Sequence, residues 1–416
     1  MALAKQVGSL QMKLSSSNMQ ENPLFFDRNL AHTTMHPLGL HIERAEGIYV
    51  IDKDGKAYMD LVSGIGVNNI GHGVKPVIDA IKAQLDKHMH VMVYGEYEQS
   101  AQTQAAKELT SLLPEQLNCA YFLNSGTEAN EAALKLAKRL TRRTKLVSCR
   151  GAYHGSTHGS LSVSGNEMKK SAFRPLLPDV HFIRFGYFED LKMIDERTAG
   201  VIMETIQGDA GVRIPTPEYL QAVRKRCDEV GAKLIFDEIQ CGMGRSGTYF
   251  AFSQFGVIPD ILTLGKALAG GMPVGCFVSS KENMKELTHD PVLGHISTFA
   301  GHPVICAAVA ATIKYFKENE FICRVHEKGN YIAERLRKMP GVIEVRQRGL
   351  FFAIDMENEE IVADVVMKNL EQGLVSFWFL SCPSSFRIAP PLTITMEEIQ
   401  RALEIIQASI IYALKK

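Results

Sequence analysis

Two short apolar runs each lead into side chains that could take part in catalysis. Ile261–Leu264 is followed closely by Lys266, and Leu234–Phe236 runs into Asp237 and Glu238. Both runs have the composition of short buried strands. A lysine whose stem lies over packed strands has a desolvated amine, and desolvation lowers its pKa. Such an amine can form a Schiff base with an aldehyde.

Most lysines are solvated surface residues, so Lys266 is informative only together with the carboxylates at the end of the other run. Open α/β sheets bind ligands at the carboxyl ends of their strands. A carboxylate there could hold a protonated ring nitrogen while the lysine holds an aldehyde on the same ring. These groups occur together in pyridoxal phosphate, which is the cofactor that the pattern indicates.

A third stretch could bind the phosphate of that cofactor. Ala120–Leu123 is predicted to be a buried strand, and the turn that contains Ser125, Gly126 and Thr127 leads directly into a predicted helix. The N–H groups at a helix start, together with nearby hydroxyls, form an anion-binding site. The alternative is an ordinary Ser/Thr helix cap, which the turn alone does not exclude.

The elements that would position these residues follow from the apolar periodicity. Strands are predicted at 120–123, 146–149, 180–185, 200–203, 234–236, 261–264 and 274–279, and helices at 74–87, 99–113, 127–142, 187–195, 216–230 and 303–317. Short apolar strands that alternate with helices indicate an α/β fold, a mostly parallel seven-stranded sheet covered by helices.

The pattern changes after about residue 320. Helices are predicted at 322–338, 358–371 and 396–413, with strands at 342–346 and 350–355, which indicates a smaller α+β domain. A hairpin predicted at 47–60 could complete it. We therefore expect an N-terminal arm and hairpin over 1–70, a large cofactor-binding domain over 71–318 and a small C-terminal domain over 319–416. Residues 22–45 have no regular pattern, and 150–159 is predicted to be a loop.

The composition is that of an ordinary globular chain. It has 416 residues, 46% apolar and 22% charged, with zero formal net charge, so no basic field attracts nucleic acid or an anionic membrane. Its eight cysteines are scattered without a C-x-x-C pair, which favours reduced thiols in the cytoplasm and no metal site. No apolar run is long enough to predict a membrane span. The first twenty residues predict a mobile or loosely docked arm.

One motif suggests a function of another class. Gly242–Gly247 matches G-x-G-x-x-G, the fingerprint of an NAD-dependent dehydrogenase. The fingerprint should follow a strand directly and open a long helix, whereas here Asp237–Cys241 intervene and a short aromatic run follows. A non-catalytic binding protein is a second alternative, opposed by the polar groups that gather at several strand ends.

Seven motifs in order resemble the class III aminotransferases, the ornithine, acetylornithine and 4-aminobutyrate type of the fold-type I pyridoxal-phosphate enzymes. The resemblance runs from about Gly47 to about Thr395. The motifs are NSGTEANEAALKLA at 124–137, YHG at 153–155, ETIQGDAG at 204–211, FDEIQCGMGRSG at 236–247, TLGKALAGGMPVG at 263–275, STFAGHP at 297–303 and RIAPPLTIT at 387–395.

The resemblance implies a role for each matching residue. Lys266 would bind the cofactor aldehyde and move the proton, and Asp237 would pair with the ring nitrogen. Tyr153 and Ile239 would pack on the two ring faces, and Gln240 would reach the ring hydroxyl. The remaining implied contacts are to the phosphate, from Gly126 and Thr127 and from Thr298 of a neighbouring subunit. A homodimer with shared active sites and a ping-pong transamination follow from the same resemblance.

The residues expected to bind the substrate match the family pattern less completely than those expected to bind the cofactor. Arg387 would bind a substrate carboxylate, and Asp209 stands where the family often has a glutamate that pairs with this arginine. Family members usually continue F-H-G with an arginine for a distal carboxylate, but Ser156 stands here and cannot form a bidentate clamp. Arg174 or another basic residue could substitute. Arg387 argues against the related aminomutases, and the expected reaction moves an amino group, such as an ω-amine, to a 2-oxo acid.

Overall fold

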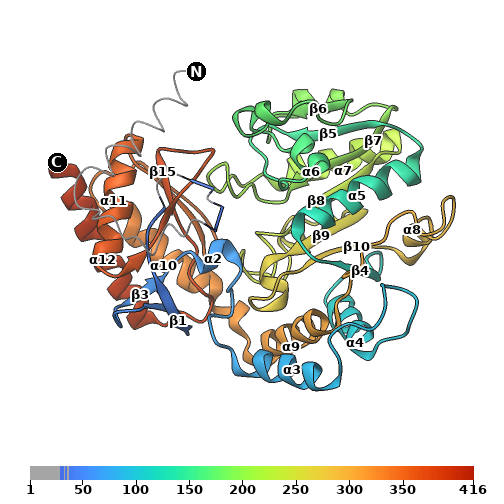
Figure 1. The fold of residues 1–416 in the computed structure, drawn as a ribbon. Helices are drawn as coiled ribbons and strands as arrows, with labels where there is room; N and C mark the ends of the chain where they lie inside the picture. The colour runs from blue at the N-terminus through green and yellow to red at the C-terminus, as the bar shows by residue number, and fades with distance from the viewer. Residues whose placement is uncertain (1–28, 32, 35–36) are drawn as a thin grey trace.

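The computed structural model describes residues 29–31, 33–34 and 37–416, and the arm predicted for the first twenty residues lies outside this part (Figure 1). Two regions are visible in Figure 1. One contains a large sheet with its covering helices, and the other contains the N-terminal strands and the C-terminal helices. Because segments from both chain ends share the second region, its packing joins residues far apart in the sequence.

The large region is built on a seven-stranded sheet, with the order β4-β10-β9-β8-β7-β5-β6. Only β10 runs antiparallel to its neighbours in this sheet, so the predicted mostly parallel seven-stranded sheet is confirmed. The strands are β4 (Cys119–Leu123), β5 (Lys145–Cys149), β6 (Val180–Ile183), β7 (Thr198–Glu204), β8 (Lys233–Asp237), β9 (Ile261–Gly265) and β10 (Gly275–Ser279).

Helices cover both faces of this sheet, and the alternation within β8 shows how. Ile235 packs in one core cluster with helix α5 (Gly126–Thr141), whereas Leu234 and Phe236 belong to the cluster that contains α7 (Pro217–Val230). Successive side chains of a strand point to opposite faces, so α5 and α7 lie on opposite sides of the sheet. This arrangement explains why the strands are continuous apolar runs.

A layer of three helices extends the large region. Helix α9 (Pro303–Asn319) packs against α3 (Lys75–Lys87) and α4 (Ser100–Thr110), at the bottom of Figure 1. Shorter helices are α2 (Ser63–Gly66), α6 (His158–Val163) and α8 (Lys281–Lys285).

Two predictions for the large region need correction. The loop predicted at 150–159 is too long, because α6 begins before its end. The helix predicted at 187–195 is also wrong in type, since Phe188–Met193 forms a 3₁₀ helix.

The second region contains two small sheets, of order β1-β2-β3-β13 and β11-β12-β15-β14. The predicted hairpin is present as β2 and β3, and β3 pairs in parallel with β13 from the C-terminal part. The strands are β1 (Ile42–Glu46), β2 (Tyr49–Asp52), β3 (Ala57–Asp60), β11 (Glu344–Arg348), β12 (Phe351–Asp355), β13 (Leu374–Val375), β14 (Phe377–Trp378) and β15 (Ser385–Ile388). Strand β1 corrects the prediction that 22–45 is irregular, and β15 was not predicted. The domain boundaries stay a prediction.

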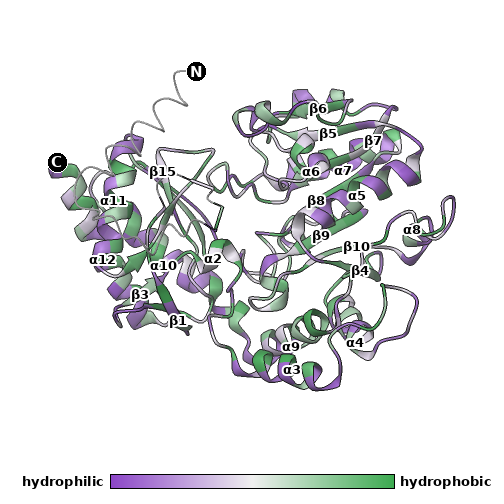
Figure 2. Ribbon diagram, in the orientation of Figure 1, coloured by the Kyte–Doolittle hydropathy of each residue, from purple (hydrophilic) through white to green (hydrophobic). Residues whose placement is uncertain are grey.

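Amphipathic helices cover these small sheets. They are α10 (Val325–Arg337), α11 (Glu359–Glu371) and α12 (Met396–Lys415). In α12 the buried residues Ile399, Leu403, Ile406 and Ile410 recur at helical spacing, and Figure 2 shows hydrophobic and hydrophilic residues alternating along it. Within the residues that the structure describes, no helix is long and apolar enough to span a bilayer.

Candidate active site

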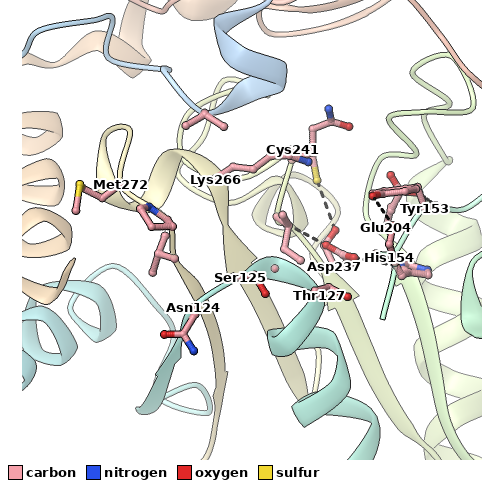
Figure 3. Close-up of a pocket in the computed structure, with 18 of the residues that line it drawn as sticks. Asn124, Ser125, Thr127, Tyr153, His154, Glu204, Asp237, Cys241, Lys266 and Met272 are labelled. Carbon is pink, nitrogen blue, oxygen red and sulfur yellow. Dashed lines mark hydrogen bonds and ion pairs between the residues drawn. The ribbon is translucent and has the colours of Figure 1, made fainter. Parts of the chain in front are cut away.

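A cavity of about 520 Å³ lies at the carboxyl edge of the large sheet (Figure 3). The strand register brings this edge together, because Glu204 pairs with Asp237, Asp237 with Thr263, and Gly265 with Gly275. Eight residues that the sequence assigned to the cofactor line this one cavity. They are Ser125, Gly126, Thr127, Tyr153, Asp237, Ile239, Gln240 and Lys266. The expected convergence of an amine and a carboxylate at two strand ends is therefore present.

Lys266 follows β9 directly and starts a short 3₁₀ helix, with a left-handed φ of 45°. A non-glycine residue in this conformation is uncommon and is held in place by its surroundings. Burial lowers the pKa of the Lys266 ammonium, and Asp237 and Glu204 act in the opposite direction. The amine is thus closer to its neutral, nucleophilic form than a surface lysine is.

Asp237 ends β8 with its carboxylate 4% exposed. Its Oδ2 atom lies 2.8 Å from Nδ1 of His154 and accepts a hydrogen bond from Nδ2 of Asn130 at 2.8 Å, while Oδ1 accepts one from the Ile239 N–H. Asn130 is itself held by the Thr263 hydroxyl. These contacts fix the carboxylate in one orientation at the cavity wall.

Glu238, the next residue, has a different environment. Its carboxylate accepts hydrogen bonds from the Thr205 hydroxyl and from the backbone N–H groups of Ala251 and Phe252. It is buried and does not line the cavity. The sequence pattern contained two adjacent acids, and the pleat of the strand end assigns one to the cavity and one to the interior.

Glu204 at the end of β7 also lines the cavity. It accepts hydrogen bonds from the N–H groups of Tyr153 and Gly208. Burial raises its pKa to about 7, although His154 acts to lower it. The family motifs include Glu204 and His154, but sequence reasoning gave neither residue a role. The available signal was the position of Glu204 directly after the predicted strand 200–203 and of His154 in the loop that follows the predicted strand 146–149.

The start of α5 forms another wall of the cavity. Ser125 is the helix N-cap and accepts a hydrogen bond from the Glu128 N–H at 3.3 Å. A Cβ atom on Gly126 would come within 2.9 Å of Ile239 Cδ1, so only glycine allows this close approach. The first N–H groups of a helix have no partner within the helix. Gly126 and Thr127 line the cavity, so the N–H groups at this helix start are placed to bind an anion there.

Arg387 and Asp209 form a second group, outside the residues that line the main cavity. Arg387 is buried in β15, and its guanidinium lies 3.2 Å from Oδ1 of Asp209. Lys169 Nζ contacts Oδ2 of the same carboxylate at 2.8 Å. Although burial acts to raise it, the pKa of Asp209 is lowered by Lys169 and Arg387. Sequence reasoning missed Lys169, which carries no motif.

Two further predicted residues lie elsewhere. Thr298 is exposed in the turn before α9 and is not among the residues that line the cavity of its own chain. Arg174 is more than half exposed and pairs with Glu167 at 2.7 Å. The run Gly242–Gly247 is followed by a 3₁₀ helix, Ala251–Gln254, and not by the long helix that a dinucleotide fingerprint requires.

Comparison with known proteins agrees with this geometry. The family model described as aminotransferase class-III matches residues 30–410. Acetylornithine aminotransferase of Methanocaldococcus jannaschii is 37% identical over 91% of this chain and 96% of its own length. The corresponding enzyme of Aquifex aeolicus is 36% identical over 88% of this chain and 95% of its own length.

Solved structures of aminotransferases have the same fold as this chain. An ornithine aminotransferase structure from Toxoplasma gondii, with pyridoxal phosphate at partial occupancy in its active site, superposes with a TM-score of 0.88. It is 27% identical and covers 100% of this chain and 98% of its own. An (S)-enantioselective ω-transaminase from Thermomicrobium roseum has a TM-score of 0.87, with 28% identity over 95% of this chain and 100% of its own. The chain therefore belongs to the class III aminotransferases and is a pyridoxal-phosphate-dependent transaminase.

Proposed function

We propose that this transaminase takes the amino group from the amine-bearing end of an amino acid of the acetylornithine, ornithine or 4-aminobutyrate type and gives it to a 2-oxo acid. The observation that carries the proposal is an amine and a carboxylate that line the main cavity, together with an arginine–aspartate pair outside its lining. Lys266 and Asp237 lie at neighbouring strand ends, Arg387 lies on a strand of another sheet, and its partner Asp209 lies on a loop. The names of the relatives in the comparisons support this donor type.

The residues present fit pyridoxal phosphate. Ser125, Gly126 and Thr127 at the start of α5 line the cavity, and a helix N-terminus that faces a cavity suits a phosphate. We assign the phosphate to Ser125, Gly126 and Thr127, and the ring nitrogen to Asp237. Tyr153 and Ile239 would flank the ring, Gln240 would meet its hydroxyl, and Lys266 would bind its aldehyde.

When bound, the cofactor supplies an electron-withdrawing ring that stabilises negative charge on the carbon next to the transferred nitrogen. Asp237 keeps a proton on the ring nitrogen, because its carboxylate is oriented by His154 and Asn130. Lys266 Nζ, with its pKa lowered by burial, takes the proton from the amine-bearing carbon and later returns one. Arg387 binds a carboxylate of the substrate, and Asp209 neutralises Arg387 when an uncharged or cationic end enters.

The proposal includes a homodimer in which Thr298 reaches the cofactor phosphate of the partner subunit. Exposed apolar side chains near Thr298 support it, because monomers rarely expose such groups together. Val292, Leu293, Ile296 and Phe299 are near it in the sequence, and Met89 and Val91 flank His90, whose ring centre lies 5.3 Å from that of Phe299. Sedimentation of the native protein tests the dimer, and a monomer at working concentration would contradict it. The cytoplasmic location stays a prediction.

The donor is tested with the purified holoenzyme. Ornithine, acetylornithine, lysine, 4-aminobutyrate and β-alanine are each offered with 2-oxoglutarate or pyruvate, and product amino acids are measured. We expect turnover with at least one donor that carries an amine away from its carboxylate. The protein should be yellow and should not respond to nicotinamide cofactors. Activity with α-amino donors alone would contradict the proposal.

A further inference from the structure

A second cavity adjoins the main one, with Tyr153 in the lining of both. It has a volume of about 220 Å³ and shares Tyr153, Gly155 and Ser156 with the main cavity, so the two lie side by side. Its other polar lining groups come from the segment around α6 and from the turn before β15. They are His158, Ser164, Asn166, Lys169 and Ser381. A substrate that reaches the main cavity could therefore place its far end here.

Lys169 gives this side cavity its charge. None of the residues that line it is acidic. Lys169 Nζ bonds to Asp209 at 2.8 Å and lies 5.5 Å from the centre of the Tyr153 ring. An ammonium has three N–H donors, so donors remain after the bond to Asp209. Its side chain is 26% exposed, which leaves it accessible from the cavity.

The charges around Lys169 do not cancel. Asp209 is shared between Lys169 and Arg387, so two cations contact one carboxylate. Glu204 also acts on Arg387, but burial raises the pKa of Glu204 to about 7, so it offsets the second positive charge only in part near neutral pH. Glu167, the nearest acid on the same segment, is engaged by Arg174 at 2.7 Å. A buried or half-buried excess charge is costly unless an anion joins it. The site is therefore suited to an additional carboxylate.

We propose that the side cavity binds the distal carboxylate of a dicarboxylic substrate, with Lys169 as the cation that replaces an arginine at the position of Ser156. This assignment rests on the proposed transaminase function and names its acceptor class as a dicarboxylic 2-oxo acid. The hydroxyl of Ser156 lies 3.4 Å from that of Tyr153, and Ser156 and Lys169 both line the side cavity. Arg174 lines neither cavity, so it is not the replacement.

The test compares two acceptors that differ by one carboxylate. In Lys169→Met, kcat/KM for 2-oxoglutarate should fall about tenfold or more relative to that for pyruvate, the loss expected for one charge-assisted hydrogen bond. Arg174→Met is the matched control and should leave the ratio unchanged. Lys169→Arg should keep the ratio, and adding Ser156→Arg to Lys169→Met should restore it. An equal loss for both acceptors, or a shift of the ratio in Arg174→Met, would overturn the assignment.

A binding measurement separates this inference from the function itself. Inhibition constants, or cofactor absorbance where turnover is absent, give the affinities of glutarate and butyrate for the holoenzyme. Glutarate should lose about tenfold in Lys169→Met, while butyrate changes little. If glutarate loses affinity in Lys169→Met but the enzyme uses none of the donors, the donor proposal is contradicted and the subsite proposal stands. If the enzyme uses the donors but the affinity for glutarate is unchanged in Lys169→Met, only the subsite proposal is contradicted.

Discussion

The two ends of the active site are built in different ways. The cofactor end is made of residues at strand termini of one sheet, where Glu204, Asp237 and Gly265 are placed by parallel and antiparallel register. The substrate end is made of Lys169 on a 3₁₀ turn, Asp209 on a loop and Arg387 on a strand of another sheet. Strand register holds the first group. In the second group register places only Arg387, which pairs with Ala353 and Phe377, whereas side-chain contacts hold Lys169 and Asp209.

This difference teaches where the chain can change without losing its chemistry. A strand end cannot shift by one residue without turning a side chain to the other face, so the cofactor groups are tied to the core. Loop residues have no such constraint. Accordingly, the departures from the family pattern, Ser156 and Asp209, both fall at the substrate end. The predictions below separate the two ends, in order of decreasing effect.

The largest effect is expected for Lys266→Ala. Turnover should fall by at least about four orders of magnitude, because the variant loses both the cofactor bond and the positioned proton carrier. Under denaturing gel filtration of borohydride-treated protein, the wild type should keep its cofactor and the variant should lose it. A variant with normal turnover would remove Lys266 from the mechanism.

Asp237→Ala should act only at the cofactor end. The rate should fall by about two to three orders of magnitude, since the ring nitrogen loses the carboxylate that keeps it protonated. Glu238→Gln is the matched control, because Glu238 is the adjacent acid and points away from the cavity. This variant should lower the unfolding temperature, whereas the reaction rate of the folded enzyme should change little. Similar rates in the two variants would contradict the division of roles.

Glu204 makes the stability of the cofactor end depend on pH. Its folded pKa is about 7, raised by burial from 4.5. The folded state therefore keeps a proton that the unfolded chain releases, and stability falls as pH rises from about 4.5 to about 7. The expected loss is roughly 3 kcal/mol. Denaturant unfolding at about pH 5 and about pH 8 should show this slope in the wild type. Glu204→Gln should remove only about half of the total slope, because burial also raises the pKa of Glu238 to about 7.

Much of the cofactor end could be predicted from the sequence, because its signals are local. An apolar run followed by Lys266, or by Asp237, is sufficient to place each side chain at a strand end. Strand β15 was missed because its two apolar residues alternate with Ser385 and Arg387 in a run too short to show a period. Likewise, Arg245 in the glycine-rich run gave no sign that it is buried and bonded to the Leu350 carbonyl.

The substrate end could be predicted only in part. The resemblance to the family named Arg387 and Asp209, but nothing in the sequence revealed Lys169, because its place depends on contacts between distant segments. Lys169 and Asp209 are 40 positions apart, and Arg387 lies 178 positions beyond Asp209. No local pattern marks such a triad. Arg174, which lies close to Lys169 in the sequence, was the named substitute for the missing arginine, but its pairing with Glu167 turns it away from both cavities.

The smallest effect is expected for Asp209→Asn, and its sign depends on the substrate. Removing the carboxylate leaves Arg387 and Lys169 without their shared anion. The free positive charge should attract 2-oxo acids and repel donors that present an ammonium. KM for each kind of substrate should change by a factor of about ten. KM for 2-oxoglutarate should therefore fall while KM for an ω-amino donor rises, and cofactor affinity should stay the same. If both KM values rise together, Asp209 only orders the loop, and the substrate end does not distinguish its two partners by charge.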